Sequence, residues 1–441
     1  MNIAIIGAGF TGITAGLRLS QNRNKVTIYE KDSFLGGLAS SIRIGNEAIE
    51  RFYHHIFISD SEILDLINEL NLKEKLNWYK PKNAVYINHT IHPFTSPLDL
   101  LRFQPLSLIS RIRMGIMALV SGFINDFSSF ETITAKEWII KYSGQEAWQK
   151  IWEPLIKSKF DTDSKNISGT WIWNKLKLRG TSRGKNLNKE MLGYLDGAFI
   201  VLAEKMVQKI IQSGGNVLLD NEVLAINKNE SGLFDVITRN NKASYDKVLF
   251  TCSPNILSEV LQVPSGTESF KLCYTRFKET LNNIKYKSNI CLVLELSQSL
   301  SPYYWITVAQ EGLPFVLIIE HTNLTGLRDY NSHVVYLSRY LDKSDNLYPA
   351  SDEEIIRVFI NGLKKVFPDF KNENIKNTVL SRAHFAQPVI TPGYSRIIPD
   401  IITPVEGLYL ASMSQIYPED RGLNYAVRLG QKAANEMLKN L

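Results

Sequence analysis

Cysteine is scarce in this chain: Cys252, Cys273 and Cys291 are the three cysteines among 441 residues. No two of them form a Cys-x-x-Cys pair, so the sequence indicates neither a disulfide framework nor a thiolate metal cluster. We therefore expect no bound metal and a reducing compartment such as the cytoplasm.

Dense runs of basic residues are lacking as well, although 50 Lys and Arg against 44 Asp and Glu leave a net charge of +6. The basic residues are spread along the chain, and no nucleic-acid-binding motif accompanies them. We expect no nucleic-acid partner. The excess charge instead suits a solvated surface, a membrane face or an acidic substrate.

The sequence also lacks an apolar run that could cross a bilayer, which takes roughly 20 residues. The most apolar region is 98–124, and its uninterrupted part covers only residues 114–124. Two interpretations of residues 98–124 remain open: a helical cap over an apolar substrate cavity, or an interfacial helix that contacts a membrane surface. The predicted location is thus cytoplasmic, with peripheral membrane association under the second interpretation.

What the sequence does contain is a glycine-rich turn between a strand and a helix at its very start. An apolar strand from residue 2 leads into Gly7–Gly12, which has the pattern Gly-x-Gly-x-x-Gly. Such glycines let the backbone approach a pyrophosphate, and the N-terminus of the next helix attracts its charge. Because this unit starts at residue 2, we expect no signal or transit peptide.

An acidic residue and a second glycine turn follow. Glu30 ends the second strand, eighteen residues after Gly12, where a carboxylate can accept hydrogen bonds from an adenosine ribose and disfavours NADP. Gly36-Gly37 then completes a Glu-Lys-x-x-x-x-Gly-Gly pattern, which resembles that of the two-dinucleotide-binding flavoproteins. An ordinary loop between strand and helix is the alternative interpretation of the glycine pair.

Near the C-terminus a second helix is expected to face the same cofactor. Residues 407–411 form a short apolar strand, and residues 422–434 have helical periodicity. Small residues at Ala426, Gly430 and Ala433 predict close packing of this helix against a sheet. Its free N–H groups suit the electron-rich edge of a reduced flavin.

With these motifs the chain resembles the FAD-dependent amine oxidase superfamily, on the side of protoporphyrinogen oxidase and phytoene desaturase. The resemblance covers nearly the full length and also includes residues 153–168 and 193–198. It implies a bound FAD and an α/β fold, in which a Rossmann-like FAD-binding domain is joined to a mixed or antiparallel-sheet substrate domain with a helical cap.

The implied domains are discontinuous. The FAD-binding domain would comprise residues 1–80, 193–255 and 401–441, the substrate domain with its helical cap residues 81–192, and its β-sheet part residues 256–400. Strands that end at Val223 and Cys252 are expected to extend the nucleotide-binding sheet.

The resemblance also implies a set of cofactor contacts. The first turn (Gly7, Gly9, Phe10, Thr11, Gly12) would hold the pyrophosphate, Glu30 and Lys31 the ribose region, Gly36, Gly37 and Leu38 the phosphates, Val223 the adenine, and Gly422 and Leu423 the isoalloxazine end. Ser412-Met413 departs from the family pattern of a glycine with an acidic or amide residue. We therefore expect Asp420 to take over the ribityl contact.

Catalytic residues are harder to predict, because FAD itself carries out the redox step. His55 and Arg51, with Tyr53, His54 and Phe57, follow the glycine pair and are the candidates, with His55 as a base. Neighbouring strand residues face opposite ways, so at most one of the two histidines should face the flavin. The alternative is a packed histidine. A second group, Tyr303–Trp305 with Glu320-His321, is more typical of core residues.

The predicted function is an FAD-dependent oxidoreductase that takes a hydride from an extended, apolar or conjugated small molecule. The alternative is a flavoenzyme similar to UDP-galactopyranose mutase, which acts on a nucleotide sugar without net redox change. That family places an arginine where this chain has Val316-Leu317, although residues 55–57 and 318–321 resemble it. A flavin-bearing lipid carrier is the non-enzymatic alternative.

Overall fold

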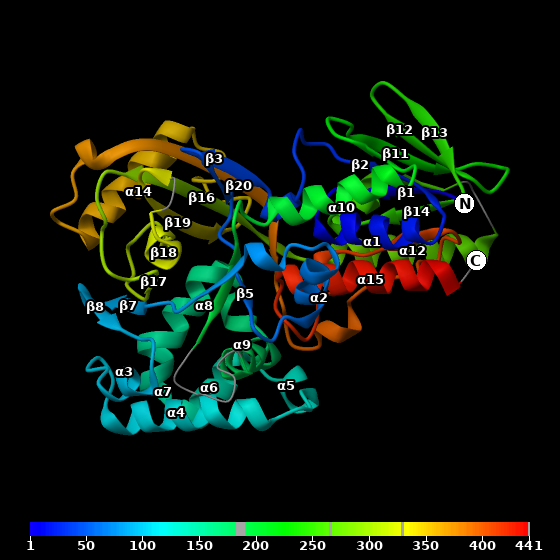
Figure 1. Ribbon diagram of the computed structural model, residues 1–441. Coiled ribbons are helices and arrows are strands. Elements are labelled where there is room, and N and C mark those ends of the chain that lie inside the picture. The colour runs from blue at the N-terminus through cyan, green and yellow to red at the C-terminus, as the bar shows by residue number, and fades with distance from the viewer. Residues whose placement is uncertain (182–189, 264–266, 328–329, 440–441) are drawn as a thin grey trace.

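The computed structural model describes residues 1–181, 190–263, 267–327 and 330–439. They form two halves side by side, one built on a parallel sheet and one on a larger mixed sheet with a layer of helices beneath it (Figure 1). The N-terminus and the C-terminal helix end close together at the far end of the parallel-sheet half.

The parallel sheet has five strands in the order β10-β2-β1-β14-β21. Its strands are β1 (Asn2–Ile6), β2 (Lys25–Tyr29), β10 (Asn216–Leu218), β14 (Lys247–Phe250) and β21 (Leu408–Leu410). Every neighbouring pair is parallel. Since side chains alternate along a strand, Ile3 and Ile5 of β1 pack into one core and Ala4 and Ile6 into another.

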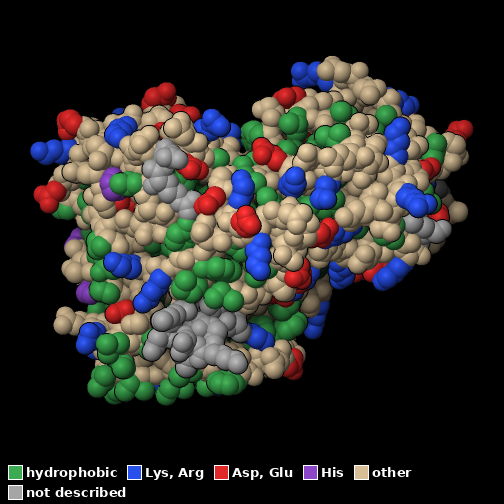
Figure 2. All heavy atoms as spheres, viewed as in Figure 1, with side chains coloured by type: hydrophobic (Ala, Val, Ile, Leu, Met, Phe, Trp, Pro, Cys, Tyr) green, Lys and Arg blue, Asp and Glu red, His purple; other side chains and the backbone are tan. Residues whose placement is uncertain are grey.

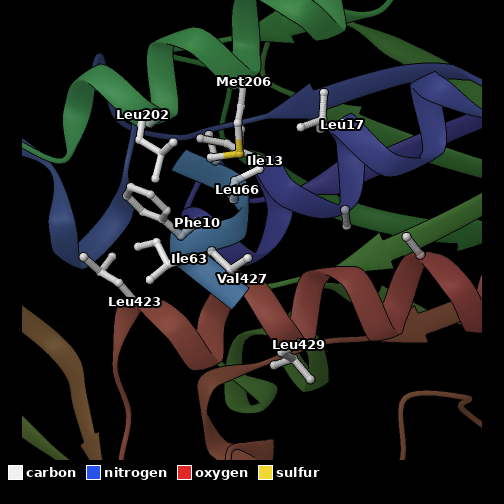
Figure 3. Packing of buried hydrophobic residues seen from close by; sticks show 14 of the residues in the cluster. Phe10, Ile13, Leu17, Ile63, Leu66, Leu202, Met206, Leu423, Val427 and Leu429 are labelled. Carbon is white, nitrogen blue, oxygen red and sulfur yellow. The ribbon is translucent and has the colours of Figure 1, made fainter. Parts of the chain in front are cut away.

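Helices cover one face of this sheet. They are α1 (Phe10–Gln21), α2 (Ser61–Glu69), α10 (Ile200–Gln212) and α15 (Leu423–Lys439). Figure 3 shows Phe10 among the side chains of the other helices in this core. A Cβ on Gly430 would lie 2.4 Å from the carbonyl oxygen of Thr11, so this glycine allows α15 to contact α1. The small residues of α15 therefore serve a close contact with a helix, where the sequence predicted a sheet.

A second sheet covers the other face, in the order β13-β12-β11-β15, and its strands are antiparallel except for the parallel pair β11 and β15. Its strands are β11 (Val223–Lys228), β12 (Phe234–Thr238), β13 (Lys242–Tyr245) and β15 (Leu261–Gln262). Val223 therefore begins a strand of this separate sheet, and the prediction that a strand ending there extends the parallel sheet is wrong. The short strand β10, which runs into the turn before Val223, takes that place.

Helices α11 (Pro254–Val260) and α12 (Glu268–Asn283) pack on the same side. Their residues Leu257, Phe277 and Leu281 lie in one core with Ala4 and Ile6. The expected division at residue 256 would assign them to the substrate domain, whereas their packing joins them to the parallel-sheet half. Apolar residues at helical spacing predict a helix, but they do not indicate which sheet the helix covers.

The second half is built on a sheet of seven strands in the order β20-β16-β19-β18-β17-β7-β8. They are β7 (Asn83–Ile87), β8 (Thr90–Pro93), β16 (Tyr286–Leu296), β17 (Trp305–Val308), β18 (Leu317–Glu320), β19 (His333–Leu341) and β20 (Ile375–Pro388). Only β17 and β7 pair in parallel, so this sheet is mixed, as expected. Helix α14 (Asp352–Val366) packs on one face, and the short α13 (Thr322–Thr325) follows β18.

Seven of the described helices form the layer below this sheet. They are α3 (Pro97–Leu101), α4 (Leu108–Phe123), α5 (Ser128–Glu131), α6 (Ala135–Ser143), α7 (Gln145–Ala147), α8 (Glu153–Phe160) and α9 (Gly169–Thr181), with a π-helical turn at Trp148–Trp152 between α7 and α8. Their core is rich in tryptophan. This layer is the expected helical cap, and none of the described helices is long and apolar enough to cross a bilayer.

Two small sheets lie where the halves meet. One is the hairpin of β3 (Ser41–Ile44) and β4 (Glu47–Glu50), and the other has the order β5-β9-β6, with β5 at Ile56–Phe57, β6 at Leu76–Tyr79 and β9 at Leu192–Leu195. Strands β4 and β5 flank residues 51–55, so the predicted catalytic segment crosses from one half to the other.

Candidate functional site

The first glycine turn connects β1 to α1. Gly7 has φ of +106°, and its N–H donates to the carbonyl oxygen of Tyr29 over 2.8 Å. A Cβ on Gly12 would lie 2.1 Å from the carbonyl oxygen of Gly7, so no side chain fits there. A Cβ on Gly9 would meet no atom within 4 Å. The backbone just before the N-terminus of α1, at Phe10, therefore borders open space.

The second glycine turn packs directly against the first. The N–H of Gly36 donates to the carbonyl oxygen of Ala8 over 2.9 Å, and Gly36 and Gly37 have φ of +98° and +57°. A Cβ on Gly37 would lie 3.3 Å from the Cα of Gly9. Leu38 continues into the short 3₁₀ turn Gly37–Ala39 and is half-buried. The structure thus brings together both glycine motifs that the sequence predicted.

Glu30 anchors the first turn. Its carboxylate accepts the N–H of Ala8 at 2.7 Å and that of Asp32 at 3.1 Å. Burial raises the pKa of this carboxyl group, against the lowering effect of the two N–H donors. Lys31 is exposed. Val223 lies close by, since the N–H of Asn221 donates to the carbonyl oxygen of Glu30 over 2.8 Å.

Helix α15 begins beside these turns, at Leu423. Leu423 is buried in the core that contains Phe10, and Gly422 precedes it. The side chain of Asn424 accepts the N–H of Ile63 over 3.0 Å and so ties α15 to α2. Two helix N-termini, those of α1 and α15, therefore belong to one packed unit.

Asp420 has different partners from those that the sequence predicted. Its carboxylate forms ion pairs with Lys159 at 3.4 Å and with Lys175, and accepts the indole N–H of Trp171 at 3.1 Å. Burial alone would raise its pKa, but the charges of Lys159, Lys175 and Arg421 hold the pKa well below its ordinary value. The side chain therefore binds the cap helices α8 and α9, and the expected ribityl contact has no support from this geometry.

Arg421 links the start of α15 to the mixed sheet. Its guanidinium donates to Gln387 over 2.8 Å and to the hydroxyl of Tyr340 over 2.5 Å. Burial and the adjacent Tyr340 raise the pKa of Tyr53 well above its ordinary value. Arg421 was not predicted from the sequence as a site residue, because it lies two residues before α15 begins and outside the motif that predicted this helix.

His55 lies among aromatic side chains of the mixed sheet. Its Nδ1 is 3.2 Å from the hydroxyl of Tyr304, and its ring meets those of Phe57 and Trp305 edge-on, at 5.2 and 6.0 Å between centroids. Tyr53 packs edge-on against Trp305 at 5.3 Å. We call this group of packed rings (Tyr53, His55, Phe57, Tyr304 and Trp305) the aromatic chamber.

His54 has other surroundings, as expected for the neighbour of His55 on an extended chain. Its Nδ1 contacts the carbonyl oxygen of Phe52 at 2.6 Å. Burial, together with the charge of Arg421, lowers its pKa to about 4. His54 is therefore neutral near pH 7 and offers no positive charge to a ligand.

Arg51 does not share the surroundings of His55. Its guanidinium lies 4.4 Å from the ring centre of Phe34, two residues before the second glycine turn. Its backbone N–H donates to Ser40 over 2.8 Å, whereas its buried Nε has no hydrogen-bond partner among the described residues. Arg51 therefore lies beside the glycine turns, apart from the catalytic group to which the sequence had assigned it.

Glu50 is a functional candidate that the sequence did not single out. It is 1% exposed, and its carboxylate accepts the hydroxyl of Tyr194 at 2.7 Å and the N–H of Phe199 at 2.8 Å. Burial raises its pKa to about 7. The local sequence, Glu-Ala-Ile-Glu at residues 47–50, gives no sign of a fully buried acid.

The second group from the sequence divides between two roles. Tyr304 and Trp305 belong to the aromatic chamber, whereas Glu320 accepts the N–H groups of Leu300 and Ser301. His321 is buried, and burial lowers its pKa to about 4. Glu320 and His321 therefore stabilise the sheet core, which was the favoured interpretation.

Comparison with known sequences links the chain to flavoproteins. A family model described as flavin containing amine oxidoreductase matches residues 10–438. Zeta-carotene desaturase of Arabidopsis thaliana is 25% identical over 50% of this chain and 43% of its own length. Protoporphyrinogen oxidase 2 of the same plant is 24% identical over 39% of this chain and 36% of its own length. The chain thus spans less than half the length of these two relatives.

A longer match and several solved structures extend this similarity. Zeta-carotene desaturase of Solanum lycopersicum is 22% identical over 93% of the chain and 76% of its own length. An Exiguobacterium sp. 255-15 protein, provisionally named a protoporphyrinogen oxidase, has a TM-score of 0.79 at 18% identity and covers 100% of this chain and 99% of its own. Reduced UDP-galactopyranose mutase has 0.76 at 15%, with coverage of 100% and 94%. At these identities the structures establish the shared fold.

Proposed function

The chain belongs to the flavin-containing amine oxidoreductase family, and we propose that it is an FAD-dependent enzyme that accepts a hydride from an extended small molecule. The observation that carries this proposal is the pair of glycine turns packed against each other at the N-terminus of α1. Bound there, FAD would supply the two-electron chemistry.

Two features of the structure fit a dinucleotide at the turns. The space beside Gly9 is open where a Cβ would stand, and the buried Nε of Arg51 lacks a partner among the described residues. Backbone N–H groups and an arginine suit a pyrophosphate. We assign the pyrophosphate to Gly7–Gly12, Gly36–Leu38 and Arg51, the adenosine to Glu30 and Val223, and the isoalloxazine end to Gly422 and Leu423.

The aromatic chamber is the proposed place for the substrate. Its rings come from the segment after β4 and from the mixed sheet, and they border Arg421 at the start of α15 through Tyr53 and Tyr340. Aromatic walls suit an apolar or conjugated body and exclude water from it. His55 is the one imidazole of the chamber, and we assign it to orient the substrate or to take its proton. His55→Phe keeps the ring packing and should lower the rate of flavin reduction.

Anaerobic mixing of the flavin-loaded protein with candidate substrates tests the redox function. A substrate of an oxidoreductase should bleach the oxidised flavin. The sequence similarity to a carotene desaturase and to a protoporphyrinogen oxidase suggests polyenes and reduced tetrapyrroles as first candidates. A mutase would turn over only after prior reduction. The mutase alternative has the fold in its favour, but Val316 and Leu317 stand where its diphosphate-binding arginine is expected. Purified protein that binds no flavin on reconstitution would contradict the proposal.

Helix α4 suggests that the enzyme works at a lipid surface. Its inward residues include Met114 and Met117, whereas its outer face is apolar and exposed, up to 85% at Phe123. The outer residues are Leu108, Ile109, Ile112, Ile116, Leu119, Val120 and Phe123. Hydrophobic side chains gather along the lower edge of the molecule, over α3 and α4 (Figure 2). Of the two interpretations of residues 98–124, this supports an interfacial helix that also caps the substrate domain.

Flotation with lipid vesicles of mixed zwitterionic and anionic composition tests this surface. Leu119→Glu should reduce the fraction of protein that floats with the vesicles, because it buries a charge in the acyl region. Leu272→Glu is the matched control, since Leu272 is similarly exposed, at 56%, on α12 in the other half. Equal flotation of both variants and the unmodified chain would contradict the interfacial role.

A further inference from the structure

Three basic side chains meet a single carboxylate between the cap and the mixed sheet. Lys159 of α8 and Lys175 of α9 both pair with Asp420, and Arg421 follows it in the chain. The side chains of Lys159 and Asp420 are only 15% and 10% exposed. Among the described residues, no other carboxylate forms an ion pair with Lys159 or Arg421. We call Lys159, Lys175, Asp420 and Arg421 the cationic cluster.

A second buried lysine shows how this fold compensates a charge that has no external role. Lys287 is 0% exposed, and its Nζ lies 2.8 Å from Asp163 and 2.6 Å from Asp342. A charge taken out of water is costly unless opposite charges and hydrogen bonds surround it. Lys287 has two carboxylates for one cation, whereas among the described residues Lys159 and Lys175 share the carboxylate of Asp420, which Arg421 follows in the chain.

Aromatic rings border the cluster but do not neutralise it. Lys159 lies 5.0 Å from the ring centre of Trp171 and 5.6 Å from that of Tyr340, and Arg421 lies 5.8 Å from Tyr340. Such contacts stabilise a cation by about 0.5 to 2 kcal/mol, but they add no negative charge. Lys159 and Arg421 therefore bring two positive charges to one buried carboxylate.

The cluster adjoins the proposed substrate site. Arg421 immediately precedes Gly422 and Leu423, and the hydroxyl of Tyr340, to which it donates, neighbours Tyr53 of the aromatic chamber. The glycine turns, which we assign to the pyrophosphate of FAD, are built by other residues. The charges of Lys159 and Arg421 are thus available to the substrate end of the site.

We propose that the cationic cluster binds an anionic group of the substrate, a carboxylate or a phosphate, while the apolar body of the substrate lies in the aromatic chamber. This inference rests on the proposed function and narrows its substrate class to anionic amphiphiles. The planar guanidinium of Arg421 has a geometry that suits either anion. The ammonium of Lys159 adds a second positive charge, which packing holds in place.

Calorimetric titration of the flavin-loaded protein with octyl phosphate, octanoate and octanol tests the proposal. These probes share one chain, so a difference in affinity reports the head group. At least one anion should bind about tenfold or more tightly than octanol, as expected for charge-assisted hydrogen bonds. The tighter of the two anions identifies the preferred head group.

Variants then locate the binding. Lys159→Met should weaken the anion about tenfold and leave octanol unchanged, because Met keeps the apolar stem. Lys157→Met is the matched control on the same helix, since Lys157 forms a surface ion pair with Glu311 and should bind the anion as the unmodified chain does. Should Lys159→Met not fold, Lys175→Met makes the same test at a more exposed cation of the cluster.

Two results would overturn the anion site. One is equal affinity for octanol and both anions, and the other is unchanged anion affinity in the Lys159 or Lys175 variant. If the protein carries flavin and shows either result, the flavin function stands and the anion site fails. If a preparation takes up no flavin but binds octyl phosphate through Lys159, the flavin function fails and the anion site stands.

Discussion

The glycine turns, which we propose to hold FAD, and the proposed substrate site would recognise their ligands in different ways. At the turns the recognising groups are backbone N–H groups and open space, and a Cβ on Gly12 would collide with the chain itself. In the aromatic chamber and the cationic cluster they are side chains from four separate stretches of sequence. A backbone site leaves little freedom of residue type, whereas a side-chain site can change its ligand by single substitutions.

The largest expected effect comes from breaking the backbone site. Gly12→Ala places a Cβ 2.1 Å from the carbonyl oxygen of Gly7, so the turn must shift and flavin should be lost during purification. The ratio of flavin to protein absorbance measures this. Gly122→Ala is the control, because its Cβ would meet no atom within 4 Å. Full flavin content in Gly12→Ala would show that the turn does not hold the cofactor.

Next in size is the loss of the shared carboxylate in the cationic cluster. Asp420→Asn removes the carboxylate that Lys159 and Lys175 share and should reduce the free energy of unfolding by about 3 to 5 kcal/mol, as for other broken buried pairs. Urea denaturation measures it. Asp342→Asn should cost less, because Lys287 keeps Asp163. Octyl phosphate should restore part of the stability of Asp420→Asn, and equal losses in both variants would contradict the contrast between the two clusters.

A smaller effect is expected at the buried acid behind the chamber. The pKa of Glu50 is raised from 4.5 to about 7 in the folded protein, so its contribution to stability is full below pH 4.5 and is lost as the pH rises through 7. At pH 8 Glu50→Gln should therefore be more stable than the unmodified chain, by about 3 kcal/mol. The difference should shrink toward pH 5. Denaturation at both pH values checks this, and a difference independent of pH would exclude Glu50 as its source.

The smallest expected effect concerns Arg51, the one long side chain that we assign to the pyrophosphate. Arg51→Met should weaken FAD binding by about 1.5 to 3 kcal/mol, the range of a charge-assisted hydrogen bond. Arg43→Met, an exposed position on β3 of the adjacent hairpin, should leave it unchanged. Equilibrium reconstitution with FAD measures both. Equal affinities of the two variants for FAD would show that Arg51 has a structural role only.

Local patterns predicted the parts of the fold that local forces dictate. Ile63, Leu66, Ile67 and Leu70 repeat at helical spacing, and all four are buried on or just after α2. The hairpin of β7 and β8 turns at Asn88-His89, between two short strands, and both residues have positive φ. By contrast, Val223 begins a strand of a separate sheet, because strand propensity does not name the partner strand.

Side-chain sites were predicted less well for the same reason. His55 and Arg51 are four residues apart, yet one lies in the aromatic chamber and the other beside Phe34 at the glycine turns. Asp420 was expected at the cofactor, but Lys159 and Lys175 from the cap bind its carboxylate. Those lysines are more than 240 residues away, and nothing in their local sequence distinguishes them from surface lysines.

By itself the sequence determined the two glycine turns, because a turn that only glycine can form requires glycine at fixed positions within a few neighbouring residues. It also determined the α/β family, since those turns occur at set distances from their strand, helix and acid. Tertiary structure alone decided which charges meet. Asp420 and Lys159 form a pair, and Lys287 has two acids, only because the cap folds back on the mixed sheet. Long-range electrostatic contacts depend on distance in space, and separation along the chain does not encode that distance.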